Sequence, residues 1–278
     1  RGNGPTFINC RFRNNVSSDN GGAVYYEATN LDQDPVSFID CDFVGNLGNK
    51  GGALFHADGS ALLDGCEFRG NVAGSAFDDP DGEGGGVHAD FIGNTSVVDC
   101  LFEDNSARFG GAMRNEVRGR LVVSDCVFRG NVATDYGGGA YNDCREGLTS
   151  LQRCVFEGNS SRQQGGGLWS RTREHSGIKV QDCTFKENSS IDEWYGGNGG
   201  GMYFTESSGC GASTVLLLNE SNLDDLGPGD TVLLRVGADL QSEWTEGVGS
   251  LKLAVVPRLS IMHEFEEIDV NAGNSIET

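Results

Sequence analysis

The stretch CLFEDNSARFGGAM, residues 100–113, decides the fold because its pattern occurs seven times along the chain. It begins Cys-x-Phe-x-x-Asn and ends Gly-Gly-(Ala or Gly)-apolar. Successive copies of the Cys are 31, 25, 34, 26, 28 and 29 residues apart. The two half-motifs are therefore fixed, while the stretches between them accept insertions, as is typical of repeat architectures.

Each half-motif keeps its residue types in every copy. The first is carried by Cys10, Phe12 and Asn15; Cys41, Phe43 and Asn46; Cys66, Phe68 and Asn71; Cys100, Phe102 and Asn105; Cys126, Phe128 and Asn131; Cys154, Phe156 and Asn159; and Cys183, Phe185 and Asn188. The second begins with glycine pairs at 21, 51, 84, 110, 137, 165 and 199.

The spacing of two between Cys and Phe predicts β-strands, because it places both side chains on one face of a strand but on different faces of a helix. A single unit is too short to form a core, so neighbouring units must stack. The expected fold is all-β: a parallel β-helix of about seven turns over residues 1–210, followed by a small antiparallel β domain over residues 211–278.

Stacking in register would place like residues above one another at about 4.8 Å per turn. We expect the Cys and Phe columns to fill the interior. The Asn column is expected to pass side-chain hydrogen bonds from turn to turn and to tolerate left-handed backbone geometry. The glycine pairs suit a corner where a side chain would clash or where φ is positive.

The alternation of Phe-x-x-Asn with Gly-Gly-Ala-aliphatic resembles the repeat of the polymorphic outer membrane proteins, surface adhesins built on a right-handed β-helix. Gly-Gly-Ala is kept at Ala23, Ala53 and Ala112, and glycine replaces the Ala at Gly86, Gly139, Gly167 and Gly201. The resemblance covers residues 1 to about 206. It implies an extracellular role at the cell surface rather than a reaction.

Composition agrees with an acidic, solvated repeat protein. The chain has 278 residues, 43 of them Gly, and a formal net charge of −21. Such acidity disfavours nucleic acid or an anionic membrane as a partner. No stretch approaches the roughly 18 apolar residues of a membrane span. Because the chain opens at Arg1 inside a repeat-like phrase, we expect a processed product or a fragment.

Beyond about residue 211 the repeat stops and strand-like stretches follow, at residues 214–218, 231–236, 250–256 and 259–265, with a strong turn signal at 227–230. These strands are too few for an immunoglobulin-like sandwich. Three interpretations stay open: a cap on the solenoid, a chain that continues, or a strand supplied by a neighbouring copy.

The nine cysteines are an odd number, so at least one thiol is unpaired or pairs between chains. The seven in the column would have parallel Cβ directions, which suit a disulfide badly, so we expect buried thiols. Cys144 and Cys210 lie outside the column and are the candidates for a disulfide or an interchain bond.

Charged residues also repeat. Three residues after each column Cys the chain has Arg13, Val44, Arg69, Glu103, Arg129, Glu157 and Lys186, so the sign alternates from the third turn onward. This pattern predicts a ladder of ion pairs that fixes the register. Immediately before the Cys come Asp40, Asp99, Asp125 and Asp182, a column of like charges that favours water or a bridging cation.

Asp78, Asp79, Asp81 and Glu83 form an acidic loop that is the candidate for a calcium-type site, because calcium takes carboxylate oxygens. A solvated acidic loop is the simpler alternative, since the spacing is not that of an EF-hand. No cofactor is required by any motif. Of the five Asn-x-Ser/Thr sequons, at Asn15, Asn94, Asn159, Asn188 and Asn219, we expect Asn94 and Asn219 to be the freer glycosylation acceptors.

Aromatic residues gather after the glycine pairs: Tyr25, Tyr26, Phe55, Tyr141, Trp169, Tyr203 and Phe204. Those that point outward would be available to a sugar or a neighbouring subunit, and those that point inward would be core. The sequence does not decide between the two, because the register of this strand is less certain than that of the Cys strand.

Function follows from the lack of a singular site. Pectate lyases and polygalacturonases share the parallel β-helix, but here no break in the repeat brings acids, a His and an Arg together. We therefore expect a non-catalytic extracellular structural or adhesive surface protein, such as a subunit of a filament or of a cell-surface appendage. Its partners would be copies of itself, head-to-tail or by strand addition, other surface proteins, or surface glycans. The alternative is a carbohydrate-active enzyme or a carbohydrate- or calcium-binding module on the same scaffold.

Overall fold

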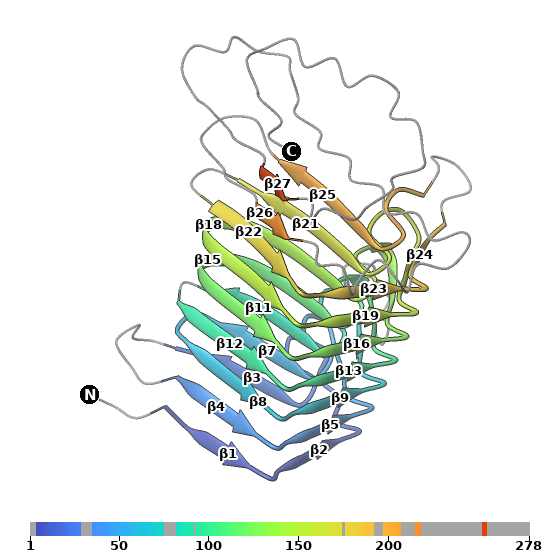
Figure 1. The fold of residues 1–278 in the computed structure, drawn as a ribbon. Helices are drawn as coiled ribbons and strands as arrows, with labels where there is room; N and C mark the ends of the chain where they lie inside the picture. Colours follow the sequence, from blue (N-terminus) through green and yellow to red (C-terminus); the bar gives the residue numbers. More distant parts are fainter. Residues whose placement is uncertain are drawn as a thin grey trace.

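The computed structural model describes residues 4–28, 35–74, 82–91, 93–173, 176–191, 197–206, 215–217 and 252–254. The regular elements in these residues are all β-strands. They pair in parallel in three sheets that stack as a solenoid (Figure 1). The predicted all-β parallel solenoid is thus confirmed.

Sheet B holds the Cys-x-Phe motif and sheet C follows it along the chain. Sheet B consists of β2 (Arg11–Arg13), β5 (Asp42–Val44), β9 (Glu67–Arg69), β13 (Leu101–Glu103), β16 (Val127–Arg129), β19 (Val155–Glu157) and β23 (Thr184–Lys186). Sheet C consists of β6 (Leu47–Gly48), β10 (Val72–Ala73), β14 (Ser106–Phe109), β17 (Val132–Tyr136), β20 (Ser160–Ser161) and β24 (Ser189–Ser190).

Sheet A carries the rest of each turn, usually as two successive strands. Its strands are β1 (Thr6–Ile8), β3 (Val24–Glu27), β4 (Val36–Ile39), β7 (Leu54–Ala57), β8 (Ala61–Asp64), β11 (Val87–Phe91), β12 (Asn94–Val98), β15 (Met113–Ser124), β18 (Ala140–Gln152), β21 (Leu168–Thr172), β22 (Ser176–Gln181), β25 (Met202–Glu206), β26 (Val215–Leu217) and β27 (Lys252–Ala254). In β15 and β18 the two halves of the turn are one continuous strand, and the register between them shifts at Val117.

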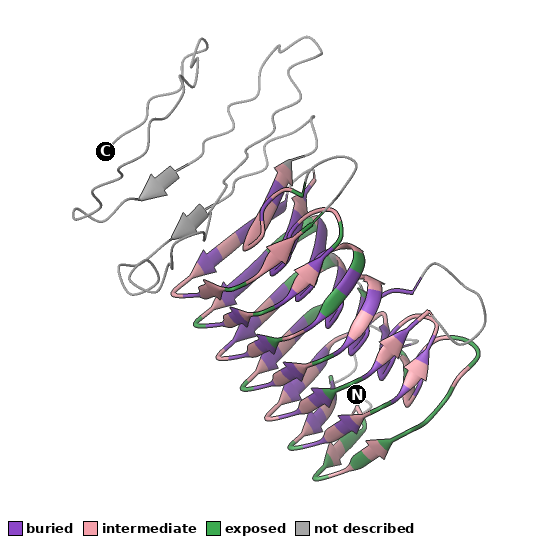
Figure 2. Ribbon diagram, turned by 90° about the vertical axis from the view of Figure 1, so that its right-hand side faces the viewer, coloured by how far each residue is buried: buried purple, intermediate pink, exposed green. Residues whose placement is uncertain are grey.

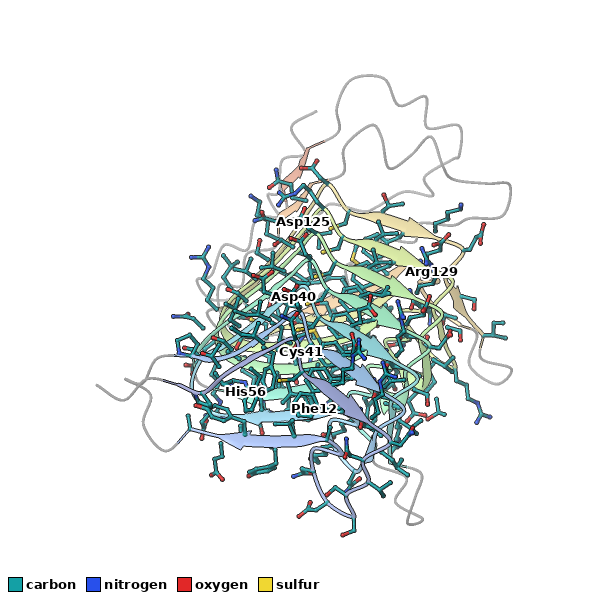
Figure 3. All side chains as sticks on the ribbon, turned by 90° about the horizontal axis from the view of Figure 1, so that it is seen from below. Phe12, Asp40, Cys41, His56, Asp125 and Arg129 are labelled. Carbon is teal, nitrogen blue, oxygen red and sulfur yellow. The ribbon has the colours of Figure 1, made fainter. Side chains whose placement is uncertain are left out.

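Each interior column repeats one residue type from rung to rung, as predicted. The seven motif phenylalanines stack with ring centroids 4.6–4.9 Å apart and ring planes within 9° of parallel. The column cysteines beside them are free thiols, and those from Cys41 onward are buried. Burial raises the pKa of the Cys41 thiol. The thiol donates a hydrogen bond to the carbonyl oxygen of Ile39 at 3.2 Å. Figure 3 shows Cys41 and Phe12 inside the coil and Arg129 at its outer edge.

The Asn column forms a hydrogen-bonded ladder. The Nδ2 atom of Asn105 donates to Oδ1 of Asn131 at 3.0 Å and to the carbonyl of Phe68 at 2.8 Å. Its own Oδ1 accepts from both the backbone N and Nδ2 of Asn71. The same pattern runs from Asn15 to Asn188. Each inner amide therefore fills its hydrogen-bonding capacity inside the protein, where an unpaired amide would be costly.

One expectation about the corners is wrong. The left-handed residue is the one before each ladder Asn, with φ between 53 and 65° at Asn14, Gly45, Gly70, Asp104, Gly130, Gly158 and Glu187. The ladder Asn itself does not have positive φ. At the glycine pairs both predicted reasons hold: Gly51 has φ of 64°, and a Cβ on Gly22 would lie 2.0 Å from the carbonyl oxygen of Gly52.

Burial follows the ladders. Figure 2 shows buried residues on successive rungs and exposed ones concentrated on the rung nearest the N-terminus. There Asn15 is exposed and Phe12 is only half-buried, whereas Phe43 on the next rung is fully buried. Phe43 lies between two described rungs, whereas Phe12 is covered by a described rung on one side, which accounts for the difference.

Two further described strands of sheet A follow the boundary drawn at residue 210. The stretch 214–218, predicted to open an antiparallel domain, contains β26, which pairs in parallel with β22. The described strand β27 also pairs in parallel, with β26. The remainder of the predicted C-terminal domain lies outside the described residues.

Candidate functional site

The outer face of sheet A differs from rung to rung. It presents the outward side chains of β3, β7, β11, β15, β18, β21 and β25, and of the strands that follow them in the same turn. At the second residue of each of these strands, the register aligns Tyr25, Phe55, His88, Arg114, Tyr141, Trp169 and Tyr203. Tyr26 and Phe204 pack instead with the interior cluster. The structure thus separates the aromatic residues that the sequence left undivided.

The outward aromatic rings stack on one another along the solenoid axis. Tyr25 lies 5.3 Å from Phe55, and Tyr141 lies 4.3 Å from Trp169, with planes 12° and 5° apart. Trp169 continues to Tyr203 at 6.3 Å. Because neighbouring rungs cover the ring faces, Phe55, Tyr141 and Trp169 are each no more than 7% exposed. Tyr25, at the end of the column, is 51% exposed, but these three rings have little free surface for stacking on a sugar.

Residues that precede the glycine pairs pack beside this column. Phe109 contacts the Tyr141 ring edge-on, and Tyr136 lies 5.7 Å from Trp169. The indole Nε1 of Trp169 donates to Oε1 of Gln164 at 3.1 Å. The first glycine of each pair has positive φ and turns the chain between the residue before the pair and the outward residue of the following strand. The turn places these two residues next to one another.

An ion cluster, here called the Glu83 cluster, interrupts the aromatic column in its third and fourth rungs. It consists of Lys50, Glu83, His88, Arg114 and Glu116. Oε2 of Glu83 lies 2.8 Å from Arg114, 3.0 Å from Lys50 and 3.4 Å from Nδ1 of His88. The other guanidinium nitrogen of Arg114 reaches Glu116 at 2.6 Å, and Arg145 lies 3.5 Å from the same carboxylate.

Electrostatics keeps the histidine of this cluster neutral. Burial lowers the pKa of His88 well below its usual value, and the positive charges of Arg114 and Lys50 act in the same direction. Nearby, burial raises the pKa of Asp90, with a further contribution from Glu116. The cluster is therefore a set of compensated charges around Arg114 rather than a free acid and base.

A second set of ion pairs lies on the next two rungs. Asp143 is buried, and both Arg171 and Arg173 bind its carboxylate through Nε and Nη2. Burial acts to raise the pKa of Asp143, but the bonds from Arg173 and Arg171 outweigh it and lower the pKa. Arg171 also lies over the Trp169 ring, at 5.4 Å from its centroid.

The expectation that acids, a His and an Arg do not converge is wrong, because Glu83, His88 and Arg114 meet. They come from two successive turns, and Lys50 comes from the turn before. Sequence reasoning missed them because the position after the apolar residue of the glycine motif was read only for aromatics. The change from aromatic to His88 and Arg114 at that position was the available signal.

The predicted calcium-type loop is only partly visible. Asp78, Asp79 and Asp81 lie outside the described residues, and the carboxylate of Glu83 faces the basic residues just named. Within the described ranges, no group of three or more His, Cys, Asp or Glu side chains is arranged to hold a metal ion.

The remaining predicted positions separate into exposed and buried. Asn94 is exposed at the start of β12, as a glycosylation acceptor requires, whereas Asn219 and Cys210 lie outside the described residues. Cys144 is fully buried, outside the Cys column as expected, and burial raises its pKa. A thiol in that position is shielded from another chain, which does not favour an interchain bond.

Both charge columns on the sheet B side are present. Glu103 lies 3.3 Å from Arg69 and 3.7 Å from Arg129, and Glu157 lies 3.0 Å from Arg129 and 3.9 Å from Lys186, which confirms the predicted alternation. In the Asp column the close approach of like charges is relieved by a residue that the prediction omitted. Arg153, the residue before Cys154, binds both oxygens of Asp125 at 2.7 Å and lowers the pKa of that carboxyl.

Comparison with known proteins identifies the fold family. In the described part of the chain no helix is long and apolar enough to cross a membrane. No curated protein and no solved structure matches the chain significantly. The family described as "Right handed beta helix region" matches residues 1–216. Because that match covers well over half of the sequence, and the stacked parallel strands are those of a β-helix, the chain belongs to the right-handed β-helix family.

Proposed function

We propose that the protein is a non-catalytic structural or adhesive component of a cell surface. The observation that carries this proposal is the continuity of the interior ladders: seven stacked phenylalanines and seven linked asparagines run from Phe12 to Asn188 without a break. A scaffold benefits from uniform rungs, whereas an enzyme concentrates its function in one site.

The likeness of the repeat to polymorphic outer membrane protein repeats supports an extracellular location. It rests on Phe-x-x-Asn and Gly-Gly-Ala-aliphatic, and these are the residues that form the Asn ladder and the tight corner. Other copies of the chain, other surface proteins and surface glycans are the partners we propose. No cofactor is needed for such a role, and calcium at residues 78–83 stays a prediction.

Assembly into filaments would use the same geometry. Every rung offers the next one an equivalent set of strand and Asn hydrogen bonds, so a rung from another molecule would find matching donors and acceptors. Electron microscopy of the native material tests the proposal. Regular filaments or a surface layer are expected, and dispersed particles that stay single at high concentration would contradict the filament form.

A carbohydrate-active enzyme is the second candidate, because Glu83, His88 and Arg114 converge on one face. Against it, His88 and Arg114 are no more than 9% exposed, and both ends of the Arg114 guanidinium already hold carboxylates. A polyuronate lyase assay, read by the ultraviolet absorbance of the unsaturated product, separates the two. Activity that disappears in Glu83→Gln would favour the enzyme, and no product from a folded protein favours the scaffold.

A further inference from the structure

Charge is unevenly divided along the outer face of sheet A. The first seven strands of this sheet, β1, β3, β4, β7, β8, β11 and β12, contain Glu27, Asp64 and Asp90 but no Lys or Arg. The next four, β15, β18, β21 and β22, contain six basic residues and three acidic ones. The basic residues are Arg114, Arg118, Arg120, Arg145, Arg171 and Lys179.

These charges point away from the core. Val24 and Tyr26 pack with the interior cluster, so Glu27, on the alternate parity of β3, faces outward and is exposed. Asp90 shares its register column and is also exposed. In β15 the buried Leu121 and Val123 define the inner side, and Arg118 and Arg120 are exposed on the outer side.

Part of the basic charge is not neutralised within the face. Asp143 is shared by Arg171 and Arg173, and Glu116 by Arg114 and Arg145. Because Glu83 also pairs with Arg114, the basic excess rests on the shared Asp143 and on the exposed Arg118 and Arg120. The early rungs have the opposite excess. In a chain with a formal net charge of −21, a basic excess on one part of a face departs from the average and favours a partner of opposite charge.

From this division we propose that the outer face of sheet A binds a second copy of the same chain, face to face and antiparallel. A two-fold axis perpendicular to the solenoid would place the acidic early rungs of each copy against the basic later rungs of the other. Glu27 would then oppose the region of Arg171 and Arg173, and Asp90 would oppose Arg118. Such a contact is isologous, because one patch complements itself.

The size of the face is adequate for a dimer. Seven rungs at about 4.8 Å give a length of about 30 Å, which is compatible with the roughly 800 Å² per partner that stable interfaces bury. A polyanion would satisfy only the basic half and leave the acidic half opposed by nothing. A second copy satisfies both halves, which is why it is the occupant we infer.

Charge reversal in the two halves tests this contact. The acidic-half variant is Glu27→Lys with Asp90→Lys, and the basic-half variant is Arg118→Glu with Arg120→Glu; all four residues are exposed. Alone, each variant would place like charges opposite one another and is expected to raise the dimer dissociation constant by about 100-fold or more. Mixed together, the two variants should associate more tightly than either variant alone, because the reversed position 90 of one copy then opposes the reversed positions 118 and 120 of the other. Position 27 still faces Arg171 and Arg173, so the mixture is compared with each single variant and not with the wild type.

Sedimentation velocity of the full chain under reducing conditions is the measurement, at low and at high salt. Matched controls reverse charges on sheet B and the corner after it: Arg11→Glu with Arg13→Glu, and Glu67→Lys with Glu187→Lys. They should leave the wild-type dimer unchanged, while salt should weaken it because exposed charges are screened. Circular dichroism establishes that every variant is folded.

The proposal is overturned if the wild type is a monomer at low salt, if the reversed variants still dimerise alone, or if their mixture associates no more tightly than either variant alone. A monomer that binds a sulfated polymer through the basic half would assign the surface to a polyanion instead. The outcome is independent of the filament experiment, since head-to-tail assembly uses the ends of the solenoid and this contact uses its side.

Discussion

The interior ladders and the outer face of sheet A lie on the same rungs but follow opposite rules. Inside, Phe102 stacks on Phe68 and Phe128, and Asn105 links to Asn71 and Asn131, so each position has a copy of itself above and below. Outside, the aligned residues change from Phe55 to His88 to Arg114 to Tyr141. The ladders therefore maintain the fold, and the outer face is where this chain differs from a generic solenoid.

The largest effect should come from breaking the ladder at its centre. Asn105→Ala removes four hydrogen bonds in a fully buried position, and leaves the Phe68 carbonyl and the amides of Asn71 and Asn131 short of partners. We expect a loss of about 5 kcal/mol in the free energy of unfolding. Urea denaturation followed by circular dichroism measures it.

Asn15→Ala is the matched control at the exposed end of the same ladder. Its Nδ2 makes one side-chain bond, to Asn46. The expected loss is about 1 kcal/mol, and equal losses at the two positions would show that the ladder does not act through burial.

Next in size is the loss of the central cation of the Glu83 cluster. Arg114→Met leaves the carboxylates of Glu83 and Glu116 without their shortest ion pairs in a buried environment. Breaking one side of a buried ion pair typically costs about 3–5 kcal/mol, and the free energy of unfolding should fall by about 4 kcal/mol. A loss of stability smaller than about 1 kcal/mol, the value of a surface ion pair, would mean that Lys50 and water compensate the two carboxylates when Arg114 is removed.

Acid should destabilise the protein through a buried histidine. Burial lowers the pKa of His56 to about 4, below the 6.5 of an unfolded histidine. Between these values the unfolded chain binds a proton that the folded chain does not, so stability is present above pH 6.5 and falls as the pH drops to about 4. The shift corresponds to about 3 kcal/mol.

His56→Phe supplies the control for this titration, since a ring stacked on Tyr26 is retained and the ionisable group is removed. The difference between the pH profiles of the two proteins, measured by urea midpoints, isolates His56 from His88 and the carboxylates. Parallel profiles would show that His56 does not titrate in this range.

The smallest effect is expected at the exterior ion ladder. Arg129→Met removes pairs with Glu103 and Glu157 from a side chain that is 52% exposed. Exposed pairs contribute little, so we expect a change below about 1 kcal/mol that vanishes at high salt. If Arg129→Met lowered the free energy of unfolding as much as Arg114→Met, the exterior ion pairs would be as strong as those of the Glu83 cluster, which would contradict this expectation.

The residues of sheet B and its corners were predictable because their neighbours in space are copies of themselves. Once Cys126, Phe128 and Asn131 are aligned with the preceding unit, the stack and the Asn ladder follow from a strand's period of two. The left-handed position was misplaced by one residue, since the sequence does not show whether the Asn or the residue before it turns the chain.

The Glu83 cluster could not be found in this way. Its members come from three turns of unequal length, and their meeting depends on which residues of each insertion lie in register. Arg153 was likewise missed. It is the only basic residue in the column that precedes the cysteines, and the prediction considered only the aspartates of that column.

By itself, then, the sequence determined the solenoid, its stacked interior and its acidity, because local periodicity repeated seven times leaves one way to bury the apolar face. Only the tertiary structure decided which aromatic residues turn outward, that Glu83, His88 and Arg114 meet, and that acidic and basic rungs share one face. Those relations join residues of unlike units, and the insertions between the half-motifs set their register.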